Sequence, residues 1–201
     1  MGFFDFLFPP RADESVVRDA SLDTFLVLMD PELVPLGGAN ATALLPFPDA
    51  LVRAAIHEAK YRGNEKAFML LAAALAEYLR DCDEDMRHAV IIPVPLGEKR
   101  RQERGYNQAE EVARRAAKEL GIAVETEMLA RTRETISQVS LPREQRKENM
   151  RGAFGTAHSA SPSHLYIVID DVLTTGATLS SAVSALRTAG AENILPIALA
   201  H

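Results

Sequence analysis

A chain of 201 residues, 47% of them hydrophobic and 25% charged, is long enough to bury one sizeable core and has the composition of an ordinary globular protein. Its net charge of −6 argues against a protein that coats nucleic acid, and the single cysteine, Cys82, excludes an intramolecular disulfide and a zinc cluster built on cysteines. No apolar run approaches the roughly 18 residues of a membrane span, and the first ten residues lack the features of a secretory signal, so we expect a cytoplasmic protein with no place in the membrane.

The charge is unevenly distributed along the chain. Residues 99–151 hold 13 Lys and Arg against 9 Asp and Glu, so this segment is basic within an acidic protein. A basic middle segment favours a cleft for an anion. Solvated charges on helix faces would produce part of the same bias, and this alternative stays open.

The N-terminal quarter of the chain differs from the rest in its pattern. Residues 1–48 combine an apolar start with Pro and Gly punctuation, and we expect an irregular segment there, a candidate hood, before a main domain over residues 49–201. Two helices are predicted next. The first begins after Asp49, a good N-cap, and stops at Gly63, and the second covers residues 65–81.

Strands and helices alternate in the remaining chain, which is typical of an α/β fold. The pattern predicts, in order, strand 89–95, helix 107–121, strand 122–133, a long loop 132–149, strand 164–170, helix 178–189 and strand 193–200. This order indicates a parallel sheet with right-handed crossovers. In such sheets ligands bind at the carboxyl ends of the strands.

The stretch YIVIDDVLTTGATL, residues 166–179, carries the most specific chemistry. Asp170 and Asp171 end an apolar strand, and burying two adjacent carboxylates is costly without a partner, so we expect a ligand to supply one. Three threonine hydroxyls and the N–H groups of the next helix suit a phosphate, and Gly176 lets the backbone approach it without a Cβ. Carboxylates suit sugar hydroxyls or waters on Mg²⁺, and together these features describe a ribose 5-phosphate. In the alternative interpretation, the acids cap the turn and the threonines satisfy it locally.

The stretch GEKRRQERG, residues 97–105, is the second candidate for anion binding. It follows a predicted strand, so it lies at the same edge of the sheet as the phosphate loop, and arginine grips paired anion oxygens well. Solvated charges on an exposed turn are the alternative. The four cations are Lys99, Arg100, Arg101 and Arg104.

These motifs resemble a known family. Residues 166–179 match the signature of the type I phosphoribosyltransferases, and three further stretches resemble the ComF-type competence and amidophosphoribosyltransferase-like proteins: IHEAKYRGN (56–64), PVPLGEKRRQERGYNQAE (93–110) and TISQVSLPREQRKENMRGAF (135–154). The resemblance covers about residues 50–201. It implies a type I phosphoribosyltransferase fold, phosphoribosyl pyrophosphate (PRPP) as ligand or substrate, and Mg²⁺.

The resemblance also implies roles for particular residues. Asp170 and Asp171 would hold the ribose hydroxyls and Mg²⁺, through water, and would be the catalytic carboxylates. The long loop 132–149 would close over the site, with an ordinary surface linker as the alternative. Lys60 and Tyr61 of the first motif either serve the site or cap the last turn of their helix, and they are not expected to be catalytic. The 5-phosphate would lie on Leu173, Thr174, Thr175, Gly176, Ala177 and Thr178, and the pyrophosphate on Leu96, Lys99, Arg100 and Arg104.

One feature departs from the family pattern. ComF-type proteins usually begin with a cysteine-rich zinc module, whereas LFPPRADESVV continues here without cysteine. The five histidines lack the spacing of metal ligands, so we expect no zinc.

Two functions stay open at this point. The first is a Mg²⁺-dependent transferase that moves ribose 5-phosphate from PRPP to an unidentified nitrogen acceptor with release of pyrophosphate. The second, implied by the competence role of the family, is a non-catalytic scaffold that binds single-stranded DNA and a helicase-like partner. Aromatic stacking residues are sparse in the basic segment, with only Tyr106 there and Phe154 just beyond it, which weakens the second function. A homodimer is compatible with either.

Overall fold

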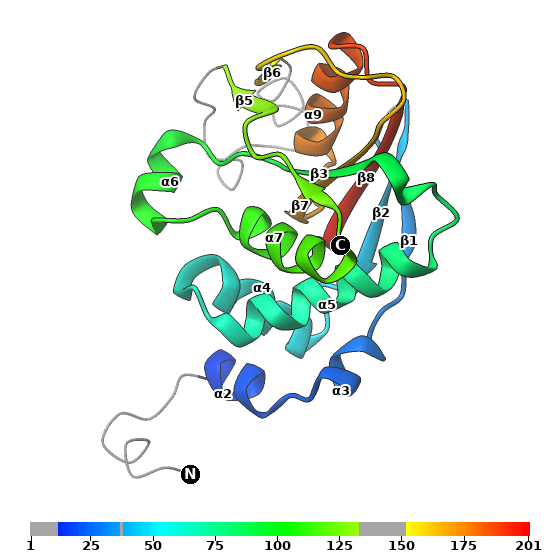
Figure 1. The fold of residues 1–201 in the computed structure, drawn as a ribbon. Coiled ribbons are helices and arrows are strands. Elements are labelled where there is room, and N and C mark those ends of the chain that lie inside the picture. The colour runs from blue at the N-terminus through cyan, green and yellow to red at the C-terminus, as the bar shows by residue number, and fades with distance from the viewer. Residues whose placement is uncertain (1–11, 37, 133–151) are drawn as a thin grey trace.

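The computed structural model describes residues 12–36, 38–132 and 152–201. A central sheet of six strands has the order β1-β2-β8-β7-β3-β4, and every neighbouring pair is parallel except β1 with β2 (Figure 1). The predicted α/β fold with a parallel sheet is therefore confirmed. The strands are β1 (Glu32–Pro35), β2 (Asn40–Leu45), β3 (Ala89–Pro93), β4 (Ala123–Val124), β7 (Leu165–Val172) and β8 (Asn193–Ala200).

Helices cover both faces of this sheet (Figure 1). A separate two-stranded sheet, β5 (Leu129–Arg131) with β6 (Phe154–Thr156), lies on the same side as α9. The helices are α2 (Ala12–Asp19), α3 (Leu22–Leu26), α4 (Ala50–Arg62), α5 (Glu65–Asp81), α6 (Glu98–Arg104), α7 (Gln108–Leu120) and α9 (Ala177–Thr188). Within the described ranges, no helix has the length and apolar character needed to cross a membrane.

Strand β7 separates two hydrophobic cores. Ile167 and Ile169 pack with α4, α5 and α7, whereas Tyr166 and Val168 pack with α9 and the small sheet. This division follows from the period of two in a strand, since successive side chains point to opposite faces. A strand that is buried on both faces needs a continuous apolar run, as the sequence of β7 provides.

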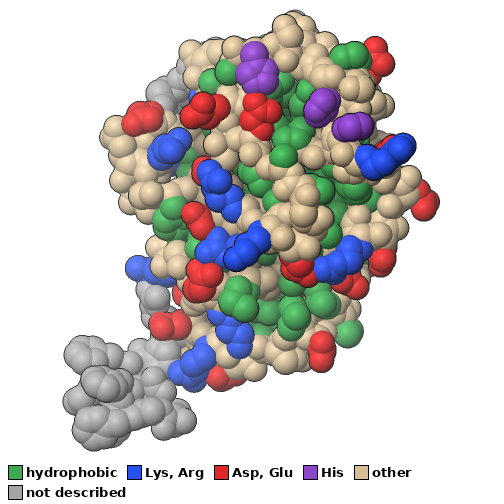
Figure 2. Space-filling model, in the orientation of Figure 1, with side chains coloured by type: hydrophobic (Ala, Val, Ile, Leu, Met, Phe, Trp, Pro, Cys, Tyr) green, Lys and Arg blue, Asp and Glu red, His purple; other side chains and the backbone are tan. Residues whose placement is uncertain are grey.

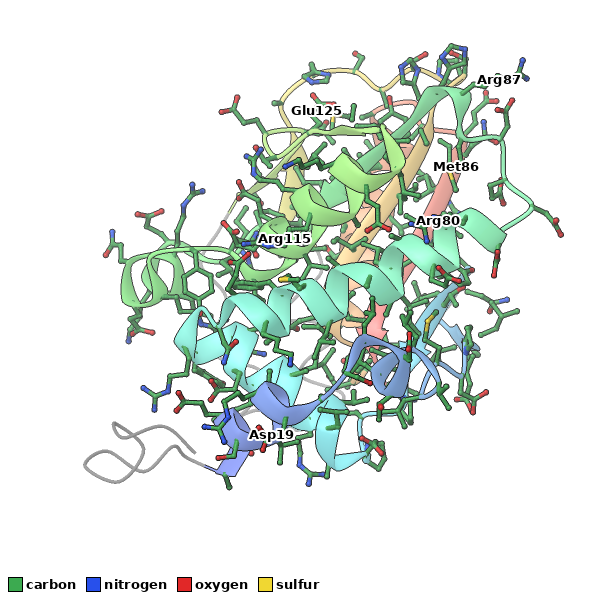
Figure 3. The ribbon with its side chains drawn as sticks, turned by 60° about the horizontal axis from the view of Figure 1, so that its bottom comes forward. Asp19, Arg80, Met86, Arg87, Arg115 and Glu125 are labelled. Carbon is green, nitrogen blue, oxygen red and sulfur yellow. The ribbon has the colours of Figure 1, made fainter. Side chains whose placement is uncertain are left out.

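Helices α5 and α7 lie side by side over the first core (Figure 3). Arg115 of α7 pairs with Glu65 of α5 at 2.7 Å, and its guanidinium lies 4.9 Å from the ring centroid of Phe68. Arg80 near the end of α5 pairs with Glu119 of α7. Both arginines are labelled in Figure 3, where they mark the line along which the two helices meet.

Local capping explains the helix boundaries. The side chains of Asp49, Asn64 and Asn107 accept backbone N–H groups at the starts of α4, α5 and α7. Gly63 and Gly121 end α4 and α7 with positive φ. The helices predicted from these residues are confirmed, as are the strands that became β3, β7 and β8, to within two residues at each end.

The expectation of an irregular segment over residues 1–48 is wrong for its described part. Four elements form there, and β2 pairs in parallel with β8, with Thr42 opposite Ile197. Five consecutive residues of β2 are buried. Its short run between Gly and Pro punctuation carries no strong local signal, and the pairing depends on the C-terminal end of the chain.

Two further expectations need correction. Residues 122–133 form two short strands, because β4 joins β3 in the main sheet while β5 turns away to pair with β6. The pattern of apolar and polar residues runs through the whole segment, so it does not show where one strand ends and the next begins. Residues 98–104 form helix α6 instead of a loop, since they are good helix formers that end at Gly105 with positive φ. Apart from Thr132, the predicted loop 132–149 lies outside the described residues.

Tyr106 fastens the end of α4 to the segment before α7. Its hydroxyl donates to the carbonyl of Ala59 at 2.8 Å and accepts the N–H of Gly63 at 2.7 Å. The Tyr106 ring meets the Phe68 ring edge-on, with 5.7 Å between centroids. These contacts place the last turn of α4 beside the carboxyl ends of the strands.

We expect Tyr106→Phe to lower the free energy of unfolding by roughly 1–3 kcal/mol, because two partly buried backbone groups lose their partner. Urea unfolding measures the change. Tyr61→Phe is the matched control, since Tyr61 is exposed to solvent at the same end of α4. Equal stability of the two variants would contradict a stabilising role for the two hydrogen bonds of the Tyr106 hydroxyl.

Candidate functional site at the carboxyl edge of the sheet

The carboxyl ends of β3 and β7 lie side by side. The N–H of Val94 donates to the carbonyl of Ile169 at 2.9 Å, and the N–H of Leu173 donates to the carbonyl of Ala200 at 2.8 Å. The segments that follow the two strands therefore start at the same edge of the sheet, as predicted. Parallel strands produce this arrangement directly, because their carboxyl ends share one edge.

The two signature acids belong to strand β7 itself and point to opposite faces of the sheet. Asp171 follows Ile169 at a spacing of two, so it faces the core built with α4 and α7. Asp170 follows Val168, so it faces the side of α9 and the small sheet. Adjacent carboxylates thus avoid direct side-by-side contact.

Asp171 has partners within the protein. Its Oδ2 accepts hydrogen bonds from the Nζ of Lys60 at 2.7 Å and the Nε2 of Gln108 at 2.8 Å. Its Oδ1 accepts a hydrogen bond from the N–H of Val172 at 2.7 Å. Burial would raise the pKa of Asp171, but the Lys60 charge and these hydrogen bonds outweigh burial and hold the pKa below its usual value. The expectation that a ligand must neutralise both acids is therefore wrong for Asp171.

Asp170 lacks such a cationic contact in the described part of the chain. Its Oδ1 accepts the N–H of Asp171 at 2.9 Å. Burial, followed by the charge of Asp171, raises the pKa of Asp170 to about 7, and Lys60 and Arg131 offset only part of this shift. The Asp170 carboxylate therefore lacks the internal compensation that Lys60 and Gln108 give to Asp171.

Residues 173–176, the predicted phosphate loop, lead into α9 without a side-chain cap. Gly176 is the N-cap residue and makes no side-chain hydrogen bond, in contrast to the Asp and Asn residues that cap α4, α5 and α7. The N–H of Ala177 reaches the hydroxyl of Thr175 only at 3.5 Å. An uncapped helix start offers N–H groups to an anion. Thr174 is exposed, Thr175 and Thr178 are partly buried, and Leu173, Gly176 and Ala177 are buried.

The structure adds a second reason for glycine at position 176. Its φ is +72°, which favours glycine, and an added Cβ would lie 2.6 Å from the Cδ2 of Leu36. Leu36 follows β1, so a residue from the N-terminal quarter of the chain covers the phosphate loop. The nearest obstacle to a side chain here belongs to the protein.

The predicted pyrophosphate residues are brought together only in part. Arg104 donates from Nη1 to the Oε1 of Gln108 at 2.9 Å, and its guanidinium lies 5.1 Å from the ring centroid of Tyr61. This links Arg104 to Asp171 through Gln108. Lys99 is exposed on α6, while Arg100 and Leu96 are partly buried.

Sequence reasoning left the role of Lys60 open and missed Gln108 and Arg131. Lys60 and Gln108 reach Asp171 directly, and Arg131 of β5 donates to the carbonyl of Pro95 at 3.1 Å while its charge acts on Asp170. Lys60 and Gln108 lie inside two of the quoted motifs, but those motifs did not indicate that the two side chains bind Asp171. Arg131 lies in a predicted strand and offered no signal.

The raised pKa of Asp170 predicts that the stability of the fold depends on pH. The unfolded carboxyl ionises near 3.8 and the folded one near 7, so the free energy of unfolding falls as the pH rises from about 3.8 to about 7. We expect Asp170→Asn to raise Tm relative to wild type, and by more at pH 8 than at pH 5, when both are measured with a chelator. A difference of 1 kcal/mol corresponds to roughly 2–4 °C at this chain length.

Asp171→Asn is the control for that experiment. Its carboxylate is stabilised in the fold, so the substitution should lower Tm at both pH values. A pH-independent effect of Asp170→Asn would contradict the assignment of Asp170 as the raised carboxyl.

Comparisons with known proteins complete the description. No protein-family model matches the chain. The chain is 37% identical over 106 residues to competence protein F of Haemophilus influenzae, covering 52% of this chain and 46% of that protein. It is 33% identical over 104 residues to DNA utilization protein YhgH of Escherichia coli K12 (52% and 45%), and 28% identical over 134 residues to competence protein ComFC of Bacillus subtilis (65% and 51%).

Solved structures resemble the chain more distantly. An APRTase from Giardia lamblia, complexed with 9-deazaadenine, aligns with a TM-score of 0.41 at 16% identity, over 89% of this chain and 84% of that chain. An adenine phosphoribosyltransferase from Leishmania tarentolae aligns with a TM-score of 0.42 at 15% identity, over 90% and 87%.

The sequence relatives show which proteins this chain is similar to. The matches span about half the length of these curated proteins. Competence proteins appear among them at both ends of the identity range. The resemblance predicted from the four motifs is confirmed, and over about half of its length this chain is similar to the ComF-type competence proteins.

Proposed function

We propose that this protein binds PRPP, or the ribose 5-phosphate part of a nucleotide, at the carboxyl edge of β3 and β7. The observation that carries the proposal is the pairing of an uncapped start of α9 with an Asp170 carboxylate that lacks a cationic contact among the described residues. The first suits a phosphate and the second suits sugar hydroxyls or a hydrated cation. Asp170 lies near the end of β7, and α9 begins a few residues after that strand.

The proposed orientation of the ligand follows from these two groups. The 5-phosphate lies on the N–H groups and hydroxyls of residues 173–178, and the ribose hydroxyls lie at Asp170. The pyrophosphate then points towards the segment after β3, where α6 carries its cations. Arg104 is the cation there that already contacts the Asp171 network.

Mg²⁺ fits this arrangement in a limited way. The described residues contain no group of three or more His, Cys, Asp or Glu that could hold a metal ion. A single carboxylate with waters and ligand phosphates is, however, the usual setting for Mg²⁺. Asp170 would hold it, through water, and the ion would neutralise charge on the pyrophosphate.

The proposed reaction needs little covalent chemistry from the protein. The nitrogen of an acceptor forms a bond to C1 of the ribose while the bond from C1 to the pyrophosphate oxygen breaks, and the acceptor loses a proton to solvent. Positive charge develops on the sugar, and the Asp170 carboxylate lies where it stabilises that charge. Residues 173–178 hold the phosphate end still, so the chain contributes mainly position and electrostatics.

A second candidate function is single-stranded DNA binding in competence, with a helicase-like partner. The names of the relatives, competence proteins and DNA utilization proteins, favour it. Figure 2 shows Lys and Arg side chains interspersed with Asp and Glu on the face that it displays, which weakens the case for a continuous basic track on that face.

Calorimetry with PRPP and Mg²⁺ tests the first function. We expect binding that is lost with a chelator and weakened by Asp170→Asn by about 1.5–3 kcal/mol, the range for hydrogen bonds to charged groups. Asp83→Asn, the same change at an exposed position, should bind as wild type does. Wild-type protein that binds neither PRPP nor ribose 5-phosphate would exclude this function. Pyrophosphate release with a panel of bases and amines then identifies the acceptor.

Fluorescence anisotropy with a labelled single strand tests the second function. Binding should weaken with salt, and neutralising the exposed Lys99 and Arg101 to Gln should reduce the salt slope by about 0.7 per lost phosphate contact. Lys118→Gln with Arg187→Gln removes the same charge from exposed positions on other helices. Equal effects of the two double variants would assign any binding to net charge alone.

A further inference from the structure

We propose that the two signature acids have different roles. Asp171 is a positioning residue anchored by Lys60 and Gln108, and of the two acids only Asp170 contacts the ligand. This inference rests on the proposed function and deepens it. Lys60, whose role the sequence left open between serving the site and capping its helix, then becomes part of the binding machinery without touching the ligand.

The anchor is built from two helices that converge on one oxygen. Lys60 comes from the last turn of α4 and Gln108 from the first residue of α7, and both donate to the Oδ2 of Asp171. The side chains of Lys60 and Asp171 are 24% and 12% exposed. An ion pair so far removed from water is screened little by salt, and it needs each partner to balance the other.

The anchor also reaches Asp170. With its carboxylate held on both oxygens, Asp171 has a fixed side chain and a fixed peptide unit. The N–H of that peptide donates to the Oδ1 of Asp170 at 2.9 Å and orients the second carboxylate. Lys60 therefore acts on Asp170 through Asp171.

Residues 104–108 hold Lys60 in place. Tyr106 binds the carbonyl of Ala59 and the N–H of Gly63 on either side of it, and Arg104 lies over the ring of Tyr61. Arg104 also holds the amide of Gln108 with its Nε2 directed at Asp171. The segment from the end of α6 to the start of α7 thus contacts both partners of Asp171 or the residues beside them.

A double-mutant cycle tests the division of labour. If Asp171 acts only as the partner of Lys60, then Lys60→Met and Asp171→Asn should each weaken Mg²⁺-PRPP binding about tenfold or more, because each leaves the other group buried and unbalanced. The combined variant should recover to within about threefold of wild type, since no unbalanced charge remains. Lys60→Arg should keep most of the affinity, and Lys118→Met, an exposed lysine lost from the far end of α7, should change nothing.

Asp170 supplies the contrasting arm. Lys60→Met combined with Asp170→Asn should bind no better than Asp170→Asn, because Asp170 meets the ligand directly. A combined Lys60→Met and Asp171→Asn variant that binds as poorly as Asp171→Asn alone would overturn the proposal and return Asp171 to the ligand.

The same cycle measured by thermal unfolding separates this proposal from the proposed function. Lys60→Met and Asp171→Asn should each lower Tm, and the combined variant should recover most of the loss. If wild type binds no PRPP but Tm recovers in this way, the proposed function fails and the anchor stands. Strictly additive losses of Tm would overturn the anchor whatever the protein binds.

Discussion

The alternation of side chains along β7 is the constraint on which the site depends. Because β7 lies in the middle of the sheet and is buried on both faces, each of its residues must suit one of two different cores. At its carboxyl end the apolar run gives way to two acids, and the same alternation sends one acid to each side. A single strand thereby supplies one carboxylate to the helices α4 and α7 and another to the side of α9.

Burial of charge then explains the difference between the two acids. On the side of α4 and α7, Lys60 and Gln108 satisfy Asp171, and the pKa of its carboxyl falls despite burial. On the other side no equally close cation is present among the described residues, and the pKa of the Asp170 carboxyl rises to about 7. Functional sites often retain such an unbalanced group, since a ligand restores the balance when it binds.

The described part of the N-terminal quarter of the chain contributes two strands to the central sheet. Strand β2 extends the sheet next to β8, and Leu36 lies where a Cβ on Gly176 would have to go. The phosphate loop therefore packs against residues far away in the chain. The positive φ of Gly176 favours glycine, and a Cβ added there would require the Leu36 side chain to move.

The sequence alone determined the parts of this protein that depend on near neighbours. Asp49, Asn64 and Asn107 cap helices within three residues of themselves, and the apolar run of β7 defines its own strand, so these elements and the parallel sheet could be predicted. The tertiary structure alone decided which face each acid occupies, that Lys60 is the partner of Asp171, and that β2 completes the sheet. The physical reason is that ion pairs and strand pairing join residues far apart in the chain, and no local pattern records which distant group will be the partner.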